Sequence, residues 1–278
     1  MTAAPIKFVT FSPAHLDGAV ALSQQARWPH RREDWAMVES LSDGIAAVLG
    51  DGVVGTAFAT PYGENAATIN MVIVDASMRG QGIGRKLMDA ALAKCEGREA
   101  RLVATQDGLP LYQKLGFQPS GTVLQYQGII GNNACYSAAE WASATDVSEL
   151  IAVDHAACGL DRSRLINRLS ETGRLAVLRE HGKIVGFAVL RDFGRGEVAG
   201  PVVARTLEEA QSLLGFLFDA RAGQFLRVDT TEDAGLVPWL KAQGLAHVGG
   251  GISMRRGGHQ MSPSSEFHVF ALASQAFG

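Results

Sequence analysis

The chain has 278 residues, and its 47% hydrophobic and 19% charged content is typical of a folded globular protein with one large or two small domains. The formal net charge of −3 argues against binding to nucleic acid or to an anionic membrane. Three cysteines without a CxxC spacing argue against a disulfide framework and against a zinc site. The N-terminus has no signal-peptide pattern, and no apolar run reaches the roughly 18 residues of a membrane span. We therefore expect a cytoplasmic protein without a membrane segment.

The first 75 residues predict an alternation of strands and helices. Ser12 is expected to cap a helix that Pro13 opens, and Asp51-Gly52 is the strongest hairpin signal in the chain. The predicted elements are, in chain order, a strand at 6–11, a helix at 13–26, a helix at 31–41, two strands within 44–60 and a strand at 67–75.

A glycine-rich segment, Arg79-Gly80-Gln81-Gly82-Ile83-Gly84, follows this last strand and leads into an amphipathic helix. Glycine allows positive φ and leaves the main chain accessible, and the N–H groups at the start of a helix attract anions. The segment therefore predicts a phosphate site, although a plain connecting turn has the same appearance. A Walker loop is excluded because Arg85-Lys86-Leu87 stands where GK[ST] is required, and Arg85 also replaces the third glycine of a dinucleotide fingerprint.

Beyond this helix we expect a strand at 100–105, a short helix at 108–117 that stops at Gly116, and a strand at 122–130. Two patterns of the first half then recur in the second. "GDGVVGTAFA" at 50–59 resembles "HGKIVGFAVL" at 181–190, and "DGLPLYQKLGF" at 107–117 resembles "AGLVPWLKAQGL" at 234–245. Because the two pairs have nearly the same offset, an internal duplication is favoured over chance similarity, with a boundary near 131–137.

The order of these motifs gives a resemblance. "NMVIVDASM", then R/Q-x-x-G-x-G/A at 79–84, then "LYQKLGF" resemble the GNAT superfamily of acetyl-CoA-dependent N-acetyltransferases. The whole chain resembles bacterial two-domain members. The resemblance implies an α/β (α+β) fold class, with tandem GNAT folds that are each a mixed, mostly antiparallel central sheet flanked by helices. It implies a GNAT domain at 1–132 that binds acetyl-CoA, and a degenerate GNAT-like domain at 133–278.

The resemblance also implies which residues hold the co-substrate, acetyl-CoA, without a metal. The backbone amides of the glycine loop would bind the pyrophosphate of coenzyme A, and the strand before it would pair with the pantetheine arm. An N–H near Val72 would polarise the thioester carbonyl. The cofactor-binding residues that this carries over are Met71, Val72, Ile73, Val74, Arg79, Gly80, Gln81, Gly82, Ile83, Gly84 and Arg85. The side chains of that strand also fit a buried core.

By the same resemblance, Tyr112 in "LYQKLGF" is the catalytic general acid that protonates the departing thiolate, unless it only packs against the sheet. Three carboxylates, Glu33, Asp34 and Glu64, could border the acceptor cleft, and the base is either a carboxylate or water. Candidates for the acceptor site are Trp28, Asn70, Asp161, Arg162 and Asp229, although Asp161 and Arg162 read equally as a helix cap and its surface neighbour.

In the second half, "RTLEEA" at 205–210 stands where the glycines would lie, and Leu240 stands in place of the tyrosine. That half is therefore expected to lack the coenzyme site and the acid. The sequence favours an N-acetyltransferase, a monomer or homodimer, acting on a primary amine of a small molecule or amino-acid-like acceptor. The alternatives are acetylation of a protein or peptide amine, a non-catalytic coenzyme A-binding or sensing module, and a binding protein for another nucleotide.

Overall fold

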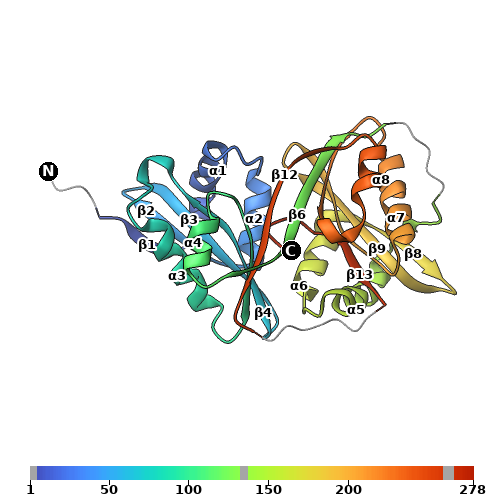
Figure 1. The fold of residues 1–278 in the computed structure, drawn as a ribbon, viewed down its shortest axis with the longest axis horizontal. Coiled ribbons are helices and arrows are strands. Elements are labelled where there is room, and N and C mark those ends of the chain that lie inside the picture. The colour runs from blue at the N-terminus through green and yellow to red at the C-terminus, as the bar shows by residue number, and fades with distance from the viewer. Residues whose placement is uncertain (1–4, 132–136, 259–265) are drawn as a thin grey trace.

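The computed structural model describes residues 5–131, 137–258 and 266–278, and two halves of the chain repeat one order of elements (Figure 1). The first half contains β1 (Lys7–Thr10), α1 (Leu16–Gln25), α2 (Arg32–Leu41), β2 (Asp43–Leu49), β3 (Gly52–Tyr62), β4 (Ala66–Val74), α3 (Ile83–Lys94), β5 (Glu99–Ala104), α4 (Leu109–Lys114) and β6 (Gln118–Ile129). The second contains β7 (Glu140–Trp141), α5 (Val147–Cys158), α6 (Ser163–Thr172), β8 (Gly173–Glu180), β9 (Lys183–Phe193), β10 (Gly196–Ala204), α7 (Leu207–Asp219), β11 (Phe225–Thr231), α8 (Val237–Ala242), β12 (Ala246–Arg256) and β13 (His268–Ala271).

The element order expected for the first half is confirmed, with one local difference. The helix expected from Pro13 starts as a short 3-10 turn, Pro13–His15, and α1 itself begins at Leu16. Ser12 caps that turn, and its backbone N–H donates to His15 Nδ1 at 3.0 Å. The expected domain boundary between 132 and 133 lies outside the described residues and stays a prediction.

Glycines at matching places explain why the two hairpin patterns look alike. A Cβ at Gly55 would lie 2.9 Å from Leu87 Cδ1 of α3, and a Cβ at Gly186 would lie 3.2 Å from Leu213 Cδ1 of α7. In each half, therefore, a helix packs so closely on the second strand of the hairpin that a side chain there would collide with it. The shared glycine reflects one packing requirement that both halves meet.

The thirteen strands of the described residues form one sheet, in the order β1-β2-β3-β4-β5-β12-β6-β11-β13-β10-β9-β8-β7. Strands β12 and β6 lie side by side at the middle of the molecule, between the first half and the second (Figure 1). Strand β12 of the second half pairs with β5 of the first, and β6 of the first half pairs with β11 of the second. The two halves have thus exchanged their last long strands.

The exchange depends on consecutive glycines in β12. Gly250 has φ +151°, and a Cβ built there would lie only 1.9 Å from the Val123 carbonyl oxygen of β6. A Cβ at Gly251 would lie 2.6 Å from Val103 Cγ1 of β5. Strand β12 can lie between β5 and β6 at this point because it carries no side chains there.

The hydrophobic core also joins the two halves. One cluster contains Trp35 and Leu41 of α2 together with Leu165 and Leu169 of α6, all buried. Two further clusters lie under α3 and α7, and each includes a residue of an exchanged strand: Met254 under α3 and Tyr126 under α7. Within the described residues, no helix is long and apolar enough to cross a membrane.

Candidate active site

Strands β4 and β5 separate to leave a gap in the first half of the sheet. They pair in parallel only from Ala66 to Thr68 of β4, opposite Glu99 to Arg101 of β5. Strand β4 keeps its antiparallel partner β3 on its other edge, and β5 keeps β12 on its other edge from Ala100 to Ala104. The edge of β4 that faces β5 is therefore without a strand partner from Ile69 onward, so its main-chain groups are free for a ligand.

A bulge in β4 lies at the mouth of this gap. Thr56 pairs with Ile73 and Phe58 pairs with Asn70, so two residues of β4 face one of β3. Met71 in the bulge has φ +49°, and its carbonyl accepts a hydrogen bond of 2.7 Å from Thr56 Oγ1. Met71 and Ile73 are buried, whereas Val72 and Val74 are half-buried. The side chains of this strand thus belong mostly to the core, as expected, and its open edge is main chain.

The glycine loop leads directly into α3. Gly80 and Gly82 have φ values of +79° and +77°, which favour glycine, and Gly82 is the N-cap of the helix. The first helical hydrogen bond runs from Lys86 N to Gly82 O at 3.1 Å, so the amides of residues 83–85 have no acceptor within the helix. Gly82 itself has no side chain that could cap this end. The geometry is that of an anion site at a helix N-terminus.

The other loop residues differ in their surroundings. Arg79 is 58% exposed and forms a long ion pair of 3.8 Å with Asp107, so it remains close to the loop. Arg85 instead donates to Asp89 one turn along the helix. The amide nitrogen of Gln81 approaches the sulfur of Met78, and Ile83 is buried in the core beneath α3.

Tyr112 lies in α4 and is 7% exposed. Its ring packs edge-on against Phe117, and a Cβ at Gly108 would lie 2.7 Å from ring atom Cε2, so Gly108 makes room for the ring. Burial raises the pKa of Tyr112 to about 12. The hydroxyl therefore keeps its proton at neutral pH, and it has no hydrogen-bond partner among the described residues.

Tyr112, Trp28 and Asn70 line one cavity of about 210 Å³, together with Met71 and Val72 of the β4 bulge. Both halves of the chain contribute to its walls. The second half supplies Phe193, Arg227, Val248, Gly249, Ser274 and Gln275, among others. No aspartate or glutamate is among the lining residues that the structure describes.

Three buried polar atoms of this cavity have no partner within the described part of the chain: His30 Nδ1, Asn70 Oδ1 and Ser274 Oγ. Buried polar atoms in native proteins are nearly always hydrogen-bonded, so unpaired ones beside a cavity indicate a ligand. Burial, outweighing the neighbouring Asp34, lowers the pKa of His30 to about 4. His30 is therefore a neutral imidazole at neutral pH.

Asp229, expected at the acceptor site, does not line the cavity but binds Arg227, which does. It is fully buried on β11, where its carboxylate accepts from Arg227 Nε at 3.0 Å and from Arg227 Nη2 at 2.7 Å. Arg227 itself lines the cavity. The sequence reasoning missed Arg227 and His30. The R-x-D spacing at 227–229 was the available signal for Arg227, because alternate residues of a strand face the same side.

Asp161 and Arg162 do not lie at this cavity. Asp161 is exposed and accepts from the backbone of Ser163 at the start of α6, while Arg162 is buried and donates to Asp154 and to the carbonyl of Gly278. Arg162 lines a second cavity of about 320 Å³, with Tyr62 and Cys158. The N-cap of α6 is Arg162, so Asp161 is not the cap that was its alternative reading, although its carboxylate accepts from the backbone just after it. Arg162 is a buried ion-pair residue rather than a surface neighbour.

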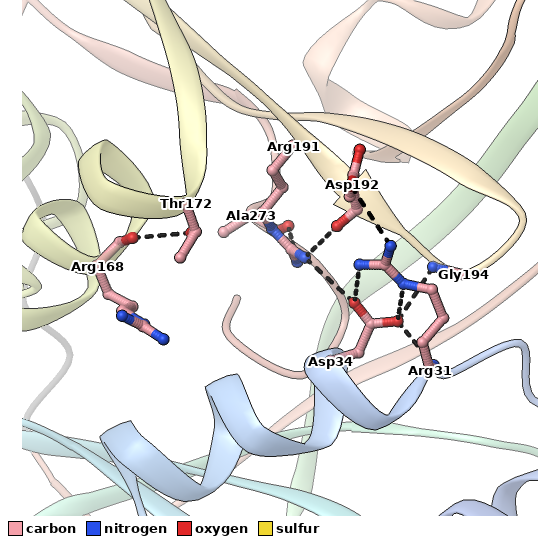
Figure 2. Close-up of polar contacts among 8 residues, drawn as sticks. All are labelled: Arg31, Asp34, Arg168, Thr172, Arg191, Asp192, Gly194 and Ala273. Atoms are coloured by element: carbon pink, nitrogen blue, oxygen red, sulfur yellow. Dashed lines mark hydrogen bonds and ion pairs between the residues drawn. The ribbon is translucent and has the colours of Figure 1, made fainter.

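The three carboxylates considered for the base also lie elsewhere. Glu33 and Glu64 are exposed, and none of the three lines the cavity. Asp34 is buried and accepts from Arg31 and from the backbone of Gly194, with Arg191 3.9 Å away (Figure 2). Its oxygens join α2 of the first half to β9 and the turn after β9, so Asp34 holds the halves together.

In the second half, the gap in the sheet and the helix N-terminus that correspond to those beside β4 and at α3 are both filled. Strand β13 occupies the gap between β10 and β11 and pairs with both strands. At the N-terminus of α7, Thr206 Oγ1 accepts from Glu209 N, and the Glu209 carboxylate accepts from the backbone of Arg205 and Thr206. Leu240 of α8 is fully buried where α4 carries Tyr112. The anion position of this half is thus occupied by its own glutamate.

Comparisons with known proteins agree with this architecture. Two family profiles, each described as an acetyltransferase (GNAT) domain, match residues 42–119 and 150–271. The uncharacterized N-acetyltransferase YitH of Bacillus subtilis is 26% identical over 281 aligned residues, covering 95% of each chain.

Solved structures share the fold at low sequence identity. A candidate acetyltransferase from Pyrococcus horikoshii has a TM-score of 0.84 at 18% identity and covers 100% of this chain and 98% of its own. A tandem GNAT protein from the clavulanic acid biosynthesis pathway has a TM-score of 0.64 at 14% identity, over 93% of this chain and 100% of its own. The chain belongs to the GNAT superfamily, with two GNAT domains, and is an acyltransferase.

Proposed function

We propose that the chain transfers an acetyl group from acetyl-CoA directly to a primary amine of a small molecule, and that only its first half binds the coenzyme. The observation that carries the proposal is the contrast between the two halves. The gap beside β4 and the N-terminus of α3 are open, while β13 and Glu209 fill the same positions in the second half. The superfamily uses acetyl-CoA, whose amide-bearing pantetheine arm and pyrophosphate suit a strand edge followed by a helix N-terminus.

The residues present fit this co-substrate. The main chain of residues 71–74 would pair with the pantetheine amides, and the free amides of residues 80–85 would bind the pyrophosphate oxygens, supported by Arg79. A main-chain N–H at the β4 bulge, near Val72, would stabilise negative charge on the thioester oxygen during attack. Acetyl-CoA supplies an acetyl thioester at this place.

The transfer needs a neutral amine and a proton for the departing sulfur. The amine nitrogen forms a bond to the acetyl carbon, the carbon–sulfur bond breaks, and Tyr112 donates its proton to the sulfur. An alkylammonium has a pKa near about 10.4, so the amine must first lose a proton. Because no carboxylate is among the described residues that line the cavity, we assign that proton to water.

The cavity size favours a small acceptor over a peptide or protein amine. A cavity of about 210 Å³, lined by both halves, suits a compact molecule held beside the thioester. A coenzyme A-sensing module would need the open gap and loop but not the unpartnered hydroxyl of Tyr112. This hydroxyl therefore favours an enzyme.

Replacing Tyr112 with phenylalanine tests the proposal. Tyr112→Phe should lower kcat for an acetylated amine by roughly 10²- to 10⁴-fold and leave the Kd for acetyl-CoA unchanged. Release of free thiol across an amine panel measures turnover, and calorimetric titration measures affinity. The matched control is Tyr126→Phe, another buried tyrosine, which lies outside the cavity lining and should keep full activity. Acetyl-CoA binding without thiol release for any amine would support the sensing module, and stabilisation by ATP or NAD alone would indicate a different nucleotide.

A further inference from the structure

Arg227 has an unpaired hydrogen-bond donor, within the described residues, at the cavity. Its Nε and Nη2 bind Asp229, whereas its Nη1 has no partner among the described residues, and the side chain lines the cavity. Asp229 accepts both contacts and a further one of 3.3 Å from Gln275, so it cannot rotate away from the arginine. The guanidinium is thus held in a fixed orientation with one N–H edge free.

The surroundings of Arg227 are rich in charged groups. The guanidinium carbons of Arg227 and Arg191 lie 4.9 and 5.1 Å from the centroid of the Phe193 ring. Three guanidiniums, those of Arg31, Arg191 and Arg227, face two buried carboxylates, those of Asp34 and Asp229 (Figure 2 shows the Arg31–Asp34–Arg191 group). The exposed carboxylate of Asp192 forms an ion pair of 3.6 Å with Arg31, so three guanidiniums face three carboxylates. Of these groups only Arg227 lines the cavity, and its free N–H edge gives this wall a cationic hydrogen-bond donor.

The β4 wall of the same cavity presents a hydrogen-bond acceptor instead of a donor. The amide nitrogen of Asn70 donates to Thr60 Oγ1 at 2.8 Å and to the Thr68 carbonyl at 3.3 Å, so Oδ1 is the end that has no partner. A carbonyl oxygen only accepts hydrogen bonds. This wall favours a hydrogen-bond donor such as an amine.

We infer that the acceptor carries a carboxylate as well as its primary amine, and that Arg227 binds this carboxylate while Asn70 Oδ1 receives the amine. The inference rests on the proposed function and narrows its substrate to small amino-acid-like molecules. A carboxylate fits better than a phosphate because one free N–H edge of a single arginine matches a monoanion. Asp229 is a positioning residue that acts through Arg227.

Matched substrates test the inference on the unaltered enzyme. The panel consists of glycine, β-alanine, 4-aminobutyrate and the common L-amino acids, together with the carboxamide of each and the aminoalkylphosphonates of equal chain length. For the best amino acid, kcat/KM should exceed that of its carboxamide by about 10- to 100-fold, as expected for a lost charged hydrogen bond. Equal rates for acid and amide would overturn the inference and leave N-acetyl transfer standing, and so would a preference for the phosphonate. Acetylation of no amine at all would overturn both proposals.

Variants then locate the effect. Arg227→Gln should raise KM for the amino acid about 10- to 100-fold, with little change for its carboxamide, and should leave the KM for acetyl-CoA unchanged. Because this variant leaves the buried Asp229 carboxylate without a cationic partner, the double variant Arg227→Gln/Asp229→Asn removes both charges and protects folding. Asp229→Asn alone should raise the same KM without lowering kcat. Arg195→Gln, which removes an exposed charge from the turn after β9, is the control. A double variant that folds and still prefers acid over amide would refute the role of Arg227.

Discussion

Gly84 is the residue at which the fold and the proposed coenzyme site make opposite demands. It stands in the first turn of α3, and its φ is not positive. A Cβ there would meet Leu111 Cδ2 and Val74 Cγ2 at 3.6 Å, an ordinary van der Waals contact. Alanine is favoured over glycine in helices by about 0.5–1 kcal/mol. We therefore expect Gly84→Ala to stabilise the ligand-free protein by about 0.5 kcal/mol and to raise its Tm by about 1–2 °C.

Acetyl-CoA should reverse this advantage. A diphosphate held against the amides of residues 83–85 would have to move away from the new methyl group, and we expect a tenfold weaker Kd, about 1.4 kcal/mol. At a concentration of about 100 times the original Kd, bound ligand stabilises the native state by about 2.7 kcal/mol. With the weaker Kd of Gly84→Ala, the same acetyl-CoA concentration stabilises the native state by only about 1.4 kcal/mol. Thermal melts with and without acetyl-CoA measure both numbers in one experiment.

Gly82 provides the matched control for this experiment. Its φ of +77° is strained for alanine, although a Cβ there would meet nothing within 4 Å. Gly82→Ala should therefore destabilise the ligand-free protein by about 1 kcal/mol. An alanine at residue 84 that raises the Tm and leaves the response to acetyl-CoA unchanged would show that the bare backbone there serves no phosphate.

Two further predictions concern stability. The lowered pKa of His30 means that the unfolded chain binds a proton between about pH 6.5 and 4 while the folded chain does not, so stability falls as the pH falls through this window. Between pH 7 and pH 4 the free energy of unfolding should therefore decrease less in His30→Phe than in the wild type, by at most about 3 kcal/mol. Urea unfolding of both proteins at the two pH values measures this difference. Gly250→Ala should cost several kcal/mol, because its Cβ would lie 1.9 Å from the Val123 carbonyl. Wild-type urea midpoints for Gly250→Ala, or an unchanged pH dependence for His30→Phe, would contradict these expectations.

Local patterns in the sequence were sufficient for the elements that carry the proposed coenzyme site. The glycines at 80 and 82 need positive φ, and the helix after them has a clear apolar face, so loop and helix could be predicted together. The self-capped end of α7 was also foreseeable, because the carboxylates of "RTLEEA" stand where the glycines would lie. These features depend on residues that are close in sequence.

The rest of the site depends on pairing between distant strands. Strands β6 and β12 have the same local character whether they pair within their own half or across the halves, so the exchange could not be predicted. The cavity wall at Phe193 and Arg227 follows from that exchange. In the sequence, Arg162 and Asp229 were both candidate ligand groups. The structure shows that Arg162 forms a buried ion pair with Asp154 beside the second cavity, whereas Asp229 holds Arg227 at the cavity that Tyr112 lines.

The exchanged strand has a consequence for any attempt to divide the protein. A fragment ending at residue 131 would keep the glycine loop and Tyr112 but would lose β12, so the facing edges of β5 and β6 would be left without partners. It would also lose Gly249 and Gly250 from the wall beside Tyr112. The two units are therefore separate along the chain but joined in space, and the first half is not expected to remain a working catalyst after proteolytic or genetic excision.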